Sequence, residues 1–357
     1  MINVTKTYLP SIKKYESYIE KIFKFGILTN NGQFVQKLEK RLEEYLNIRN
    51  LILVSNGTLA LQVAYKALEL REEVITTPFT FAATVSSQVW EGLSPVFADI
   101  NKETFCIDYK KIENLITDKS KAIIPVHVFG NACDIDEIQN IANKNNLKVI
   151  YDAAHTFGVN YKNKSILSYG DISIISFHST KLFHTIEGGG LIIKDDELYK
   201  KIKRMINFGI SGPEKIDSLG INAKMNEFQA AMGLCVLDDM DKILEGRKKA
   251  HNFYSNNLSK ELQLQKCNKD CTRNYSYFPV VFQTEKDLLR VTGELNKKDI
   301  YPRRYFYPSL DTLGYLIDSK YMPISNNISS RILCLPIYES LEEYELEQIV
   351  EIINSNL

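Results

Sequence analysis

Between about residues 51 and 193, short apolar runs alternate with helical stretches, and this alternation most limits the possible folds. The runs are apolar almost throughout, as in strands that are buried on both faces of a sheet. They lie at 51–55, 74–77, 95–98, 122–127, 147–151, 172–176 and 191–193. Strands and helices in alternation predict an α/β fold, with a parallel or mixed sheet and helices on both faces.

Helical spacing fills the intervals and both ends of the chain. We expect helices at 11–24, 34–46, 59–70, 82–90, 109–116, 134–144, 226–237, 241–258, 285–296 and 342–353. The stretch 209–222 is irregular and too polar for a core. After about residue 260, a strand at 277–282 and an aromatic loop at 301–307 indicate a second, smaller unit. We predict a large domain over residues 1–245 and a small C-terminal α+β domain over residues 246–357.

Charge and composition exclude several classes of protein. The 357 residues carry 44 Lys and Arg against 44 Asp and Glu, with no basic stretch, so we expect neither nucleic acid nor an anionic membrane as partner. No apolar run approaches the roughly 20 residues of a membrane span, and the N-terminus does not resemble a signal peptide. We therefore expect a cytoplasmic protein with reduced cysteines. Cys267 and Cys271 form the one close pair, and without further ligands nearby they predict no metal site.

Two strand ends bring reactive side chains to the same region. Lys181 follows the apolar run 172–176, and Asp152 and His155 follow the run 147–151. Ligand sites in open α/β sheets lie at the carboxyl ends of the strands. Taken alone, a lysine in this position is more typical of a side chain that reaches solvent from a loop. The carboxylate and imidazole nearby instead favour a shared site.

A third feature adds an anion site. Gly57 and Thr58 lie between a strand and the start of a helix, where free backbone N–H groups and the helix dipole attract a phosphate. A plain turn capped by Thr58 explains the same residues. An anion site, a carboxylate and a lysine together suit pyridoxal phosphate. Its phosphate would lie at the helix start, its ring nitrogen on Asp152 and its aldehyde on Lys181, as an imine.

Several motifs resemble the DegT/StrS family of sugar aminotransferases. They are Gly57-Thr58-Leu59-Ala60-Leu61, the run 77–84, Asp152-Ala153-Ala154-His155, the run 176–181 and the run 220–231. The resemblance implies a fold type I pyridoxal-phosphate enzyme with a mostly parallel seven-stranded sheet, acting on nucleotide-linked keto sugars. Within the family, the run 181–189 most resembles members that aminate dTDP-4-keto-6-deoxy-D-glucose at C4.

The resemblance also implies roles for cofactor-binding residues. Gly57, Thr58 and Ser176 would hold the phosphate, and Phe81 would stack on the ring unless it is an ordinary core residue. Asp152 would pair with the ring nitrogen. His155 would lie beside the phenolic oxygen, although a purely structural histidine is the alternative. Asn222 would reach the phosphate of the other subunit's cofactor, which implies a homodimer with shared sites.

Substrate-binding candidates are less sharply marked. His178 and His184 flank Lys181, so that one of them would touch the sugar or the amino donor, or pack locally. A basic aromatic cluster follows at Arg303, Arg304, Tyr305 and Tyr307, where it would grip a pyrophosphate or a carboxylate or form a surface loop. Asn30 and Asn31 lie in a loop that often faces substrate in the family.

These features together predict an aminotransferase that moves nitrogen from L-glutamate to a nucleotide-linked 4-keto-6-deoxy sugar, for O-antigen or other surface glycan synthesis. A 3-keto sugar nucleotide or a small keto phosphate is the alternative substrate. A sugar dehydratase of the same fold would carry histidine in place of Lys181. A regulatory or binding relative without catalysis would need neither Lys181 nor Asp152.

Overall fold

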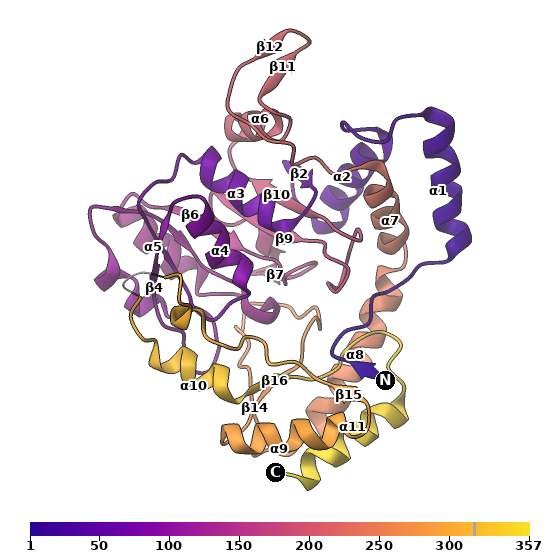
Figure 1. Cartoon of the computed structure of the whole chain (residues 1–357), viewed down its shortest axis with the longest axis vertical. Coiled ribbons are helices and arrows are strands. Elements are labelled where there is room, and N and C mark those ends of the chain that lie inside the picture. Colours follow the sequence, from indigo (N-terminus) through magenta and orange to yellow (C-terminus); the bar gives the residue numbers. More distant parts are fainter. Residues whose placement is uncertain (317–318) are drawn as a thin grey trace.

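A computed structural model describes residues 1–316 and 319–357 (Figure 1). Its centre is a seven-stranded sheet in the order β2-β10-β9-β6-β5-β3-β4. All neighbouring strands pair in parallel except β10, which runs antiparallel to both β2 and β9. The predicted α/β class with a mostly parallel seven-stranded sheet is confirmed. The strands are β2 (Leu51–Val54), β3 (Glu73–Thr76), β4 (Ser94–Phe97), β5 (Ser120–Ile124), β6 (Lys148–Asp152), β9 (Ile172–Ser176) and β10 (Gly189–Ile193).

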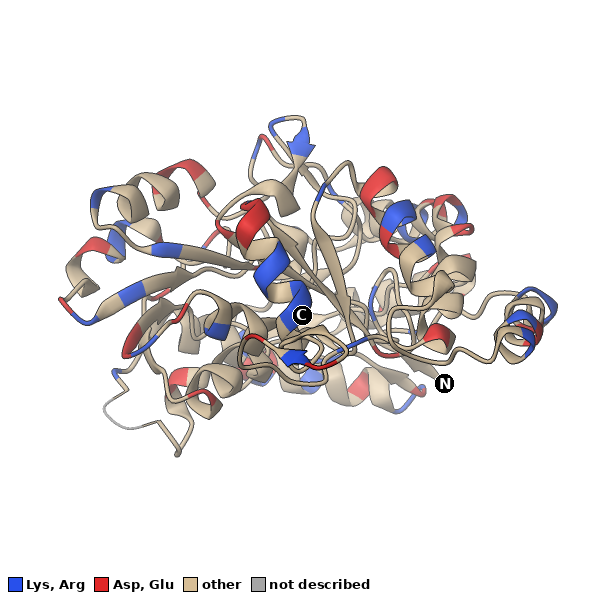
Figure 2. Ribbon diagram, turned by 90° about the horizontal axis from the view of Figure 1, so that it is seen from above, with Lys and Arg blue, Asp and Glu red and all other residues tan. Residues whose placement is uncertain are grey.

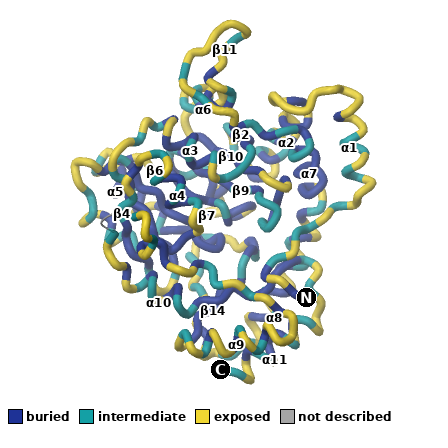
Figure 3. The backbone as a smooth tube through the Cα atoms, viewed as in Figure 1, coloured by how far each residue is buried: buried dark blue, intermediate teal, exposed yellow. Residues whose placement is uncertain are grey.

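Helices cover both faces of this sheet, because successive side chains of each strand point to opposite sides. Helices α3 (Gly57–Ala67) and α6 (Asp196–Met205) share a buried cluster with Ile52 and Val54 of β2. Leu51 and Leu53 belong instead to the cluster that includes α2 (Gln33–Leu46), α5 (Ile135–Lys144) and α7 (Glu227–Leu237). Each buried leucine or isoleucine contributes about 1.5–3 kcal/mol relative to exposure. The strands are buried almost throughout (Figure 3), which explains their near-continuous apolar sequence.

The C-terminal part forms its own apolar cluster below the sheet in Figure 1. A three-stranded sheet orders β13 (Gln263–Leu264), β14 (Pro279–Val281) and β16 (Ile332–Cys334), and the short β1 (Ile2–Asn3) pairs with β15 (Ile300–Tyr301). Helices α9 (Glu285–Asn296), α10 (Pro323–Arg331) and α11 (Glu343–Ser355) accompany them. The long helix α8 (Met240–Asn257) packs Ile243 in the main core and Tyr254 in the C-terminal cluster. The division at 245/246 falls inside α8 and stays a prediction.

Several segments differ from the sequence-based expectation. Residues 109–116, expected as one helix, form two 3-10 turns, Tyr109–Lys111 and Glu113–Leu115, with Ile112 fully buried between them. The irregular stretch 209–222 contains a hairpin of β11 (Ile210–Gly212) and β12 (Lys215–Ile216), which projects from the body (Figure 1). Helix α10 and strand β16 were not expected.

The surface mixes both charges. Lysine and arginine lie interspersed with aspartate and glutamate along the helices and loops (Figure 2), in keeping with a net charge of zero. Within residues 1–316 and 319–357, none of the helices combines the length and apolar character needed to cross a bilayer.

Candidate active site

A cavity of about 630 Å³ opens at the carboxyl edge of the central sheet. Asp152 ends β6, Ser176 ends β9, and Gly57 begins α3 directly after β2. Strand β10 runs the other way, so that its first residues reach the same edge. The loop 301–307 closes the cavity from the C-terminal part. The residues that line the cavity include Asn56, Gly57, Thr58, Gln62, Thr80, Phe81, Thr84, Asp152, His155, Ser176, His178, Thr180, Lys181, Glu187, Tyr277, Arg303, Tyr305 and Phe306.

The start of α3 forms an anion cradle. Asn56 caps the helix by accepting a hydrogen bond from the Leu59 N–H at 2.8 Å, which leaves the N–H groups of Gly57 and Thr58 without a partner in the described part of the chain. A Cβ atom added to Gly57 would lie 3.2 Å from the Ser176 Cβ at the end of β9, so a larger residue would force the helix start and Ser176 apart. Free N–H groups at a helix start suit a phosphate. The glycine therefore keeps open the space in which a phosphate would lie.

Asp152 is the buried carboxylate of the site. Its backbone N–H donates to the Pro125 carbonyl at 2.9 Å, which fixes the strand end. Its Oδ2 accepts a hydrogen bond from the Thr84 hydroxyl at 2.7 Å, and its Oδ1 accepts one from the Ala154 N–H at 3.1 Å. Burial raises the pKa of Asp152, whereas both donors and the nearby Lys181 oppose that rise. The remaining lone pairs are available to a ligand in the cavity.

Lys181 lies in the loop that follows β9. That loop is closed by hydrogen bonds from the Phe177 N–H to the Gly188 carbonyl and from the Lys181 N–H to the His178 carbonyl, at 2.8 and 2.9 Å. The Lys181 amine lies 3.3 Å from the Tyr277 hydroxyl. Burial lowers the pKa of Lys181 to about 8. A substantial share of the amine is therefore neutral near pH 8, as a nucleophile requires.

His155 has a fixed tautomer. Its Nδ1 accepts a hydrogen bond from the Phe129 N–H at 3.1 Å, so the ring hydrogen must lie on Nε2. Burial holds the pKa of His155 well below its usual range, and the ring is neutral. It stacks parallel to Phe306 at 5.9 Å between ring centroids. A neutral imidazole with a free donor suits a ligand oxygen such as a phenolate.

Phe81 also lines the cavity. It is the residue before α4 (Ala82–Trp90), and 53% of it is exposed although it lines the cavity. It is therefore not the ordinary core residue that its sequence position also allowed. A large exposed aromatic face in a cavity suits a flat aromatic ligand.

Cationic and titratable side chains also line the cavity. The Arg303 guanidinium lies 4.8 Å from the Tyr305 ring centroid, and among the described residues no carboxylate pairs with it. His178 Nδ1 accepts from the Thr180 N–H at 3.3 Å, and its Nε2 lies 3.6 Å from a Glu187 carboxylate oxygen.

The structure does not bring every predicted residue to the cavity. His184 is 1% exposed, with Nε2 at 2.7 Å from the Tyr8 carbonyl and Nδ1 accepting from the Ile186 N–H at 3.2 Å. Both ring nitrogens are satisfied, so the expectation of a substrate contact is wrong for His184. Arg304 is also engaged, with the Glu285 carboxylate at 2.6 Å.

Two other predicted residues lie outside the cavity of their own chain. Asn30 adopts a left-handed backbone (φ 63°) in an exposed loop. Asn222 is exposed and pairs in a bridge with Asn207, beside the projecting hairpin. Contacts of these residues with a partner subunit stay predictions.

Some cavity residues carried no assignment in the sequence. Thr84 lies inside a helix pattern, where a threonine has no distinctive signal. Tyr277 begins an apolar strand run some hundred positions after Lys181, and only tertiary structure joins them. Glu187 belongs to a motif that was recognised without a role. In the sequence, the one signal for a role of Glu187 was its proximity to a histidine.

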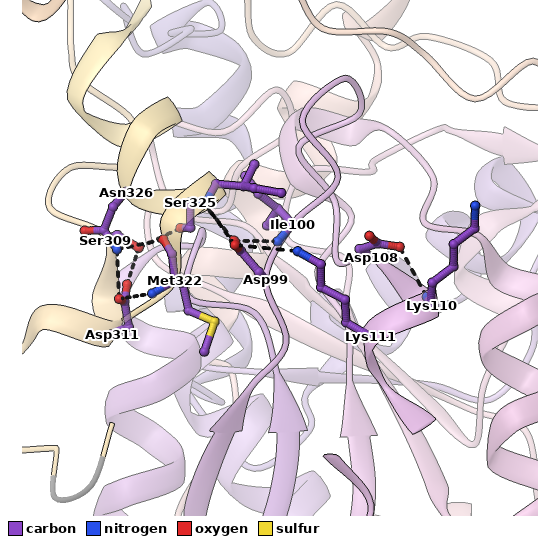
Figure 4. Close-up of polar contacts among 11 residues, drawn as sticks. Asp99, Ile100, Asp108, Lys110, Lys111, Ser309, Asp311, Met322, Ser325 and Asn326 are labelled. Atoms are coloured by element: carbon purple, nitrogen blue, oxygen red, sulfur yellow. Dashed lines mark hydrogen bonds and ion pairs between the residues drawn. The ribbon is translucent and has the colours of Figure 1, made fainter. Parts of the chain in front are cut away.

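The segment that follows the loop 301–307 is anchored by two buried aspartates (Figure 4). Asp99, which follows β4, accepts hydrogen bonds from the Ile324 and Ser325 N–H groups at the start of α10, at 2.9 and 2.8 Å. Asp311 accepts from the Met322 N–H at 2.9 Å and bonds the Ser309 hydroxyl. A carboxylate at a helix N-terminus also complements the helix dipole. These contacts tie the C-terminal segment to the main sheet beside the cavity.

Across the described ranges, no three His, Cys, Asp or Glu side chains are grouped to hold a metal ion. The anion cradle, the exposed Phe81, the buried Asp152 and the partly neutral Lys181 instead fit pyridoxal phosphate at four separate points. This set of side chains in an α/β fold suits an enzyme that binds pyridoxal phosphate and uses a lysine amine.

Comparisons with known proteins give the family. The model of the DegT/DnrJ/EryC1/StrS aminotransferase family matches residues 11–354, and the chain belongs to this family. It is 43% identical to a dTDP-4-amino-4,6-dideoxy-D-glucose transaminase of Shigella dysenteriae, over 99% of this chain and 98% of the relative. A GDP-perosamine synthase of Escherichia coli O157:H7 is 32% identical over 97% of both chains. The crystal structure of DesI in the presence of its TDP-sugar product superposes with a TM-score of 0.93 at 27% identity, covering 99% of this chain and 92% of that one.

Proposed function

We propose that this aminotransferase moves the amino group of L-glutamate to a dTDP-linked 4-keto-6-deoxy-D-glucose, giving dTDP-4-amino-4,6-dideoxy-D-glucose for a surface glycan. The half-buried Lys181 and the buried Asp152, which line one cavity, carry the transamination. The choice of sugar is supported by the likeness over the whole chain to the Shigella dysenteriae transaminase.

The chain's own groups would divide the work. When bound, pyridoxal phosphate supplies an aldehyde that carries nitrogen and a ring that stores an electron pair. Lys181 would bind the aldehyde between turnovers and would move a proton when its amine is free, for which a pKa of about 8 is suitable. Asp152 would keep the ring nitrogen protonated. His155 would donate its Nε2–H to the phenolic oxygen, and Phe81 would pack against the ring.

Substrate groups would bind in the outer half of the cavity. The diphosphate and the glutamate carboxylates are anionic, and the unpaired Arg303 guanidinium is suited to either. Tyr305 holds the guanidinium from one side. His178 and Glu187 would contact sugar hydroxyls or the donor.

A homodimer would complete the site. Phe23, Ile27 and Leu28 beside α1 (Ile12–Phe25) and Ile216 and Leu219 of the hairpin segment are large apolar residues exposed in the single chain. Asn222 lies next to this hairpin and would reach the partner's phosphate cradle. The cytoplasm is the proposed location, since the six cysteines are free thiols.

A substrate panel tests the proposal. Purified protein is incubated with L-glutamate and one sugar nucleotide at a time. The panel contains dTDP-, UDP- and GDP-linked 4-keto sugars and, as alternative substrates, dTDP- and UDP-linked 3-keto sugars. We expect fastest turnover with dTDP-4-keto-6-deoxy-D-glucose, loss of yellow colour on adding glutamate, and no turnover in Lys181→Ala. A colourless protein that takes up no cofactor contradicts the reaction class. Faster turnover of another sugar contradicts only the substrate.

A further inference from the structure

Two threonine hydroxyls stand in a row behind the carboxylate of Asp152. The Thr84 hydroxyl lies 2.7 Å from Asp152 Oδ2, and the Thr80 hydroxyl lies 2.8 Å from that of Thr84. Thr80 is 2% exposed and Thr84 is fully buried, yet both border the cavity. Three buried oxygens in a row, ending at the group assigned to the cofactor's ring nitrogen, form an arrangement that packing alone does not require.

The direction of each hydrogen bond follows from the number of available protons. An ionised carboxylate only accepts, so the single hydroxyl proton of Thr84 must go to Asp152. Thr84 then has no proton left for Thr80, and Thr80 must donate to Thr84. The row is polarised toward Asp152, and hydrogen bonds arranged in this way strengthen one another.

Asp152 needs this support because burial disfavours its ionised form. Burial raises its pKa, and a protonated carboxyl would not stabilise a protonated ring nitrogen. Lys181 opposes that rise only while its amine is charged. The amine must give up its proton, and with it its charge, before it can react. The Thr84 hydroxyl carries no charge and its contribution does not change with the state of Lys181.

One helix start places both the hydroxyls and the stacking ring. Thr84 lies in the first turn of α4, and its N–H donates to the Phe81 carbonyl at 3.1 Å. Thr80 immediately precedes Phe81. The turn therefore sets the position of the ring face and the polarised row at once, and a variant that keeps side-chain shape is needed to separate the two effects.

We propose that Thr80 and Thr84 are positioning residues that hold Asp152 ionised and aimed at the ring nitrogen of bound pyridoxal phosphate. The inference rests on the proposed function, because it takes Asp152 as the partner of that nitrogen. Neither hydroxyl exchanges a proton with substrate in this role.

The test compares two ligands that differ only at the ring nitrogen. Dissociation constants of cofactor-free protein are measured for pyridoxal phosphate and for its 1-deaza analogue, in which C–H replaces the nitrogen. Thr84→Val keeps the shape and removes the donor. We expect it to weaken pyridoxal phosphate binding about tenfold or more, the usual range for a hydrogen bond to a charged group, and to leave the analogue unchanged. Thr84→Ser restores the wild-type ratio, and Thr80→Val gives a smaller loss in the same direction.

Thr76→Val is the matched control. Thr76 is also a fully buried threonine, but its hydroxyl donates to the Ile124 carbonyl at 2.8 Å within the sheet and does not contact Asp152. This variant is expected to melt at a lower temperature without altering the ratio of the two dissociation constants.

Each remaining outcome overturns the proposal. Equal weakening of both ligands by Thr84→Val would show that the threonine only supports the shape of the wall. Unchanged binding of pyridoxal phosphate would show that Asp152 does not need the hydroxyl. If the wild-type protein binds pyridoxal phosphate no more tightly than the analogue, Asp152 does not stabilise the ring nitrogen. Failure to bind either ligand would refute the proposed function first.

Discussion

The covalent loading of Lys181 should depend on pH in a way that reports its burial. Only the neutral amine attacks an aldehyde, and burial lowers the pKa of Lys181 to about 8. About one tenth of the amine is then neutral at pH 7, compared with roughly one part in 2,500 for a lysine with a pKa of about 10.4. Loading should therefore accelerate tenfold per pH unit below 8 and level off above it.

The measurement uses cofactor-free protein mixed with pyridoxal phosphate between pH 6 and pH 10. Samples are reduced with borohydride at set times, and the modified lysine is counted by mass spectrometry. Asp152→Asn is a directional control: the Asp152 charge raises the pKa of Lys181, so its removal should move the inflection below pH 8. Lys181→Ala should give no product at the site.

Two results would refute this reasoning. A loading rate that still rises steeply beyond pH 9 would mean that Lys181 behaves as a solvated lysine, and that the cavity is wetter than its burial indicates. If pyridoxal phosphate efficiently modifies another lysine of the cavity in Lys181→Ala, Lys181 is not the amine that binds the aldehyde.

Three further variants test other parts of the site. Gly57→Ala places a Cβ 3.2 Å from the Ser176 Cβ and should weaken cofactor binding about tenfold, by equilibrium titration, because the cradle narrows; unchanged affinity would place the phosphate elsewhere. His184→Ala should lower the free energy of unfolding by about 1–3 kcal/mol, since the partners of its two ring nitrogens, the Tyr8 carbonyl among them, are left unpaired, with KM unaltered; a raised KM with normal stability would restore a substrate role. Arg303→Ala should raise KM for the sugar nucleotide or for glutamate without changing cofactor affinity, with Arg303→Lys intermediate; a loss confined to stability would make it structural.

The sheet and its reactive edge follow from sequence because both depend on local signals. Apolar runs mark strands buried on two faces, and Asp152 stands at the end of such a run. In parallel strands the carboxyl ends share an edge, so residues distant in sequence can be placed together before any coordinates are known. Phe81 and His155 were placed in the cavity by family resemblance, and the structure puts both there. Their contacts with a cofactor stay predictions.

The features that escaped the sequence depend on distant contacts. Helix α10 has a polar sequence, and its N-terminus is held by Asp99 from another part of the chain. Tyr277 meets Lys181 only because the C-terminal part folds over the sheet edge. His184 resembled His178 as a neighbour of Lys181, but the chain turns sharply between them and directs His184 into the core. Spacing along the chain did not separate these two histidines.

The antiparallel strand β10 has a consequence for the order in which the protein is made. Strand β2 is an edge strand whose one partner in the central sheet is β10, which leaves the ribosome long after it. At about 5–20 residues per second, the apolar residues of β2 wait several seconds or more for that partner. The first turn of α3, with the phosphate cradle, follows β2 directly and abuts Gly189 at the start of β10. During synthesis the nascent chain therefore completes its phosphate-binding edge only after β10 has been made, past the middle of the chain, and cofactor uptake belongs to a late step of folding.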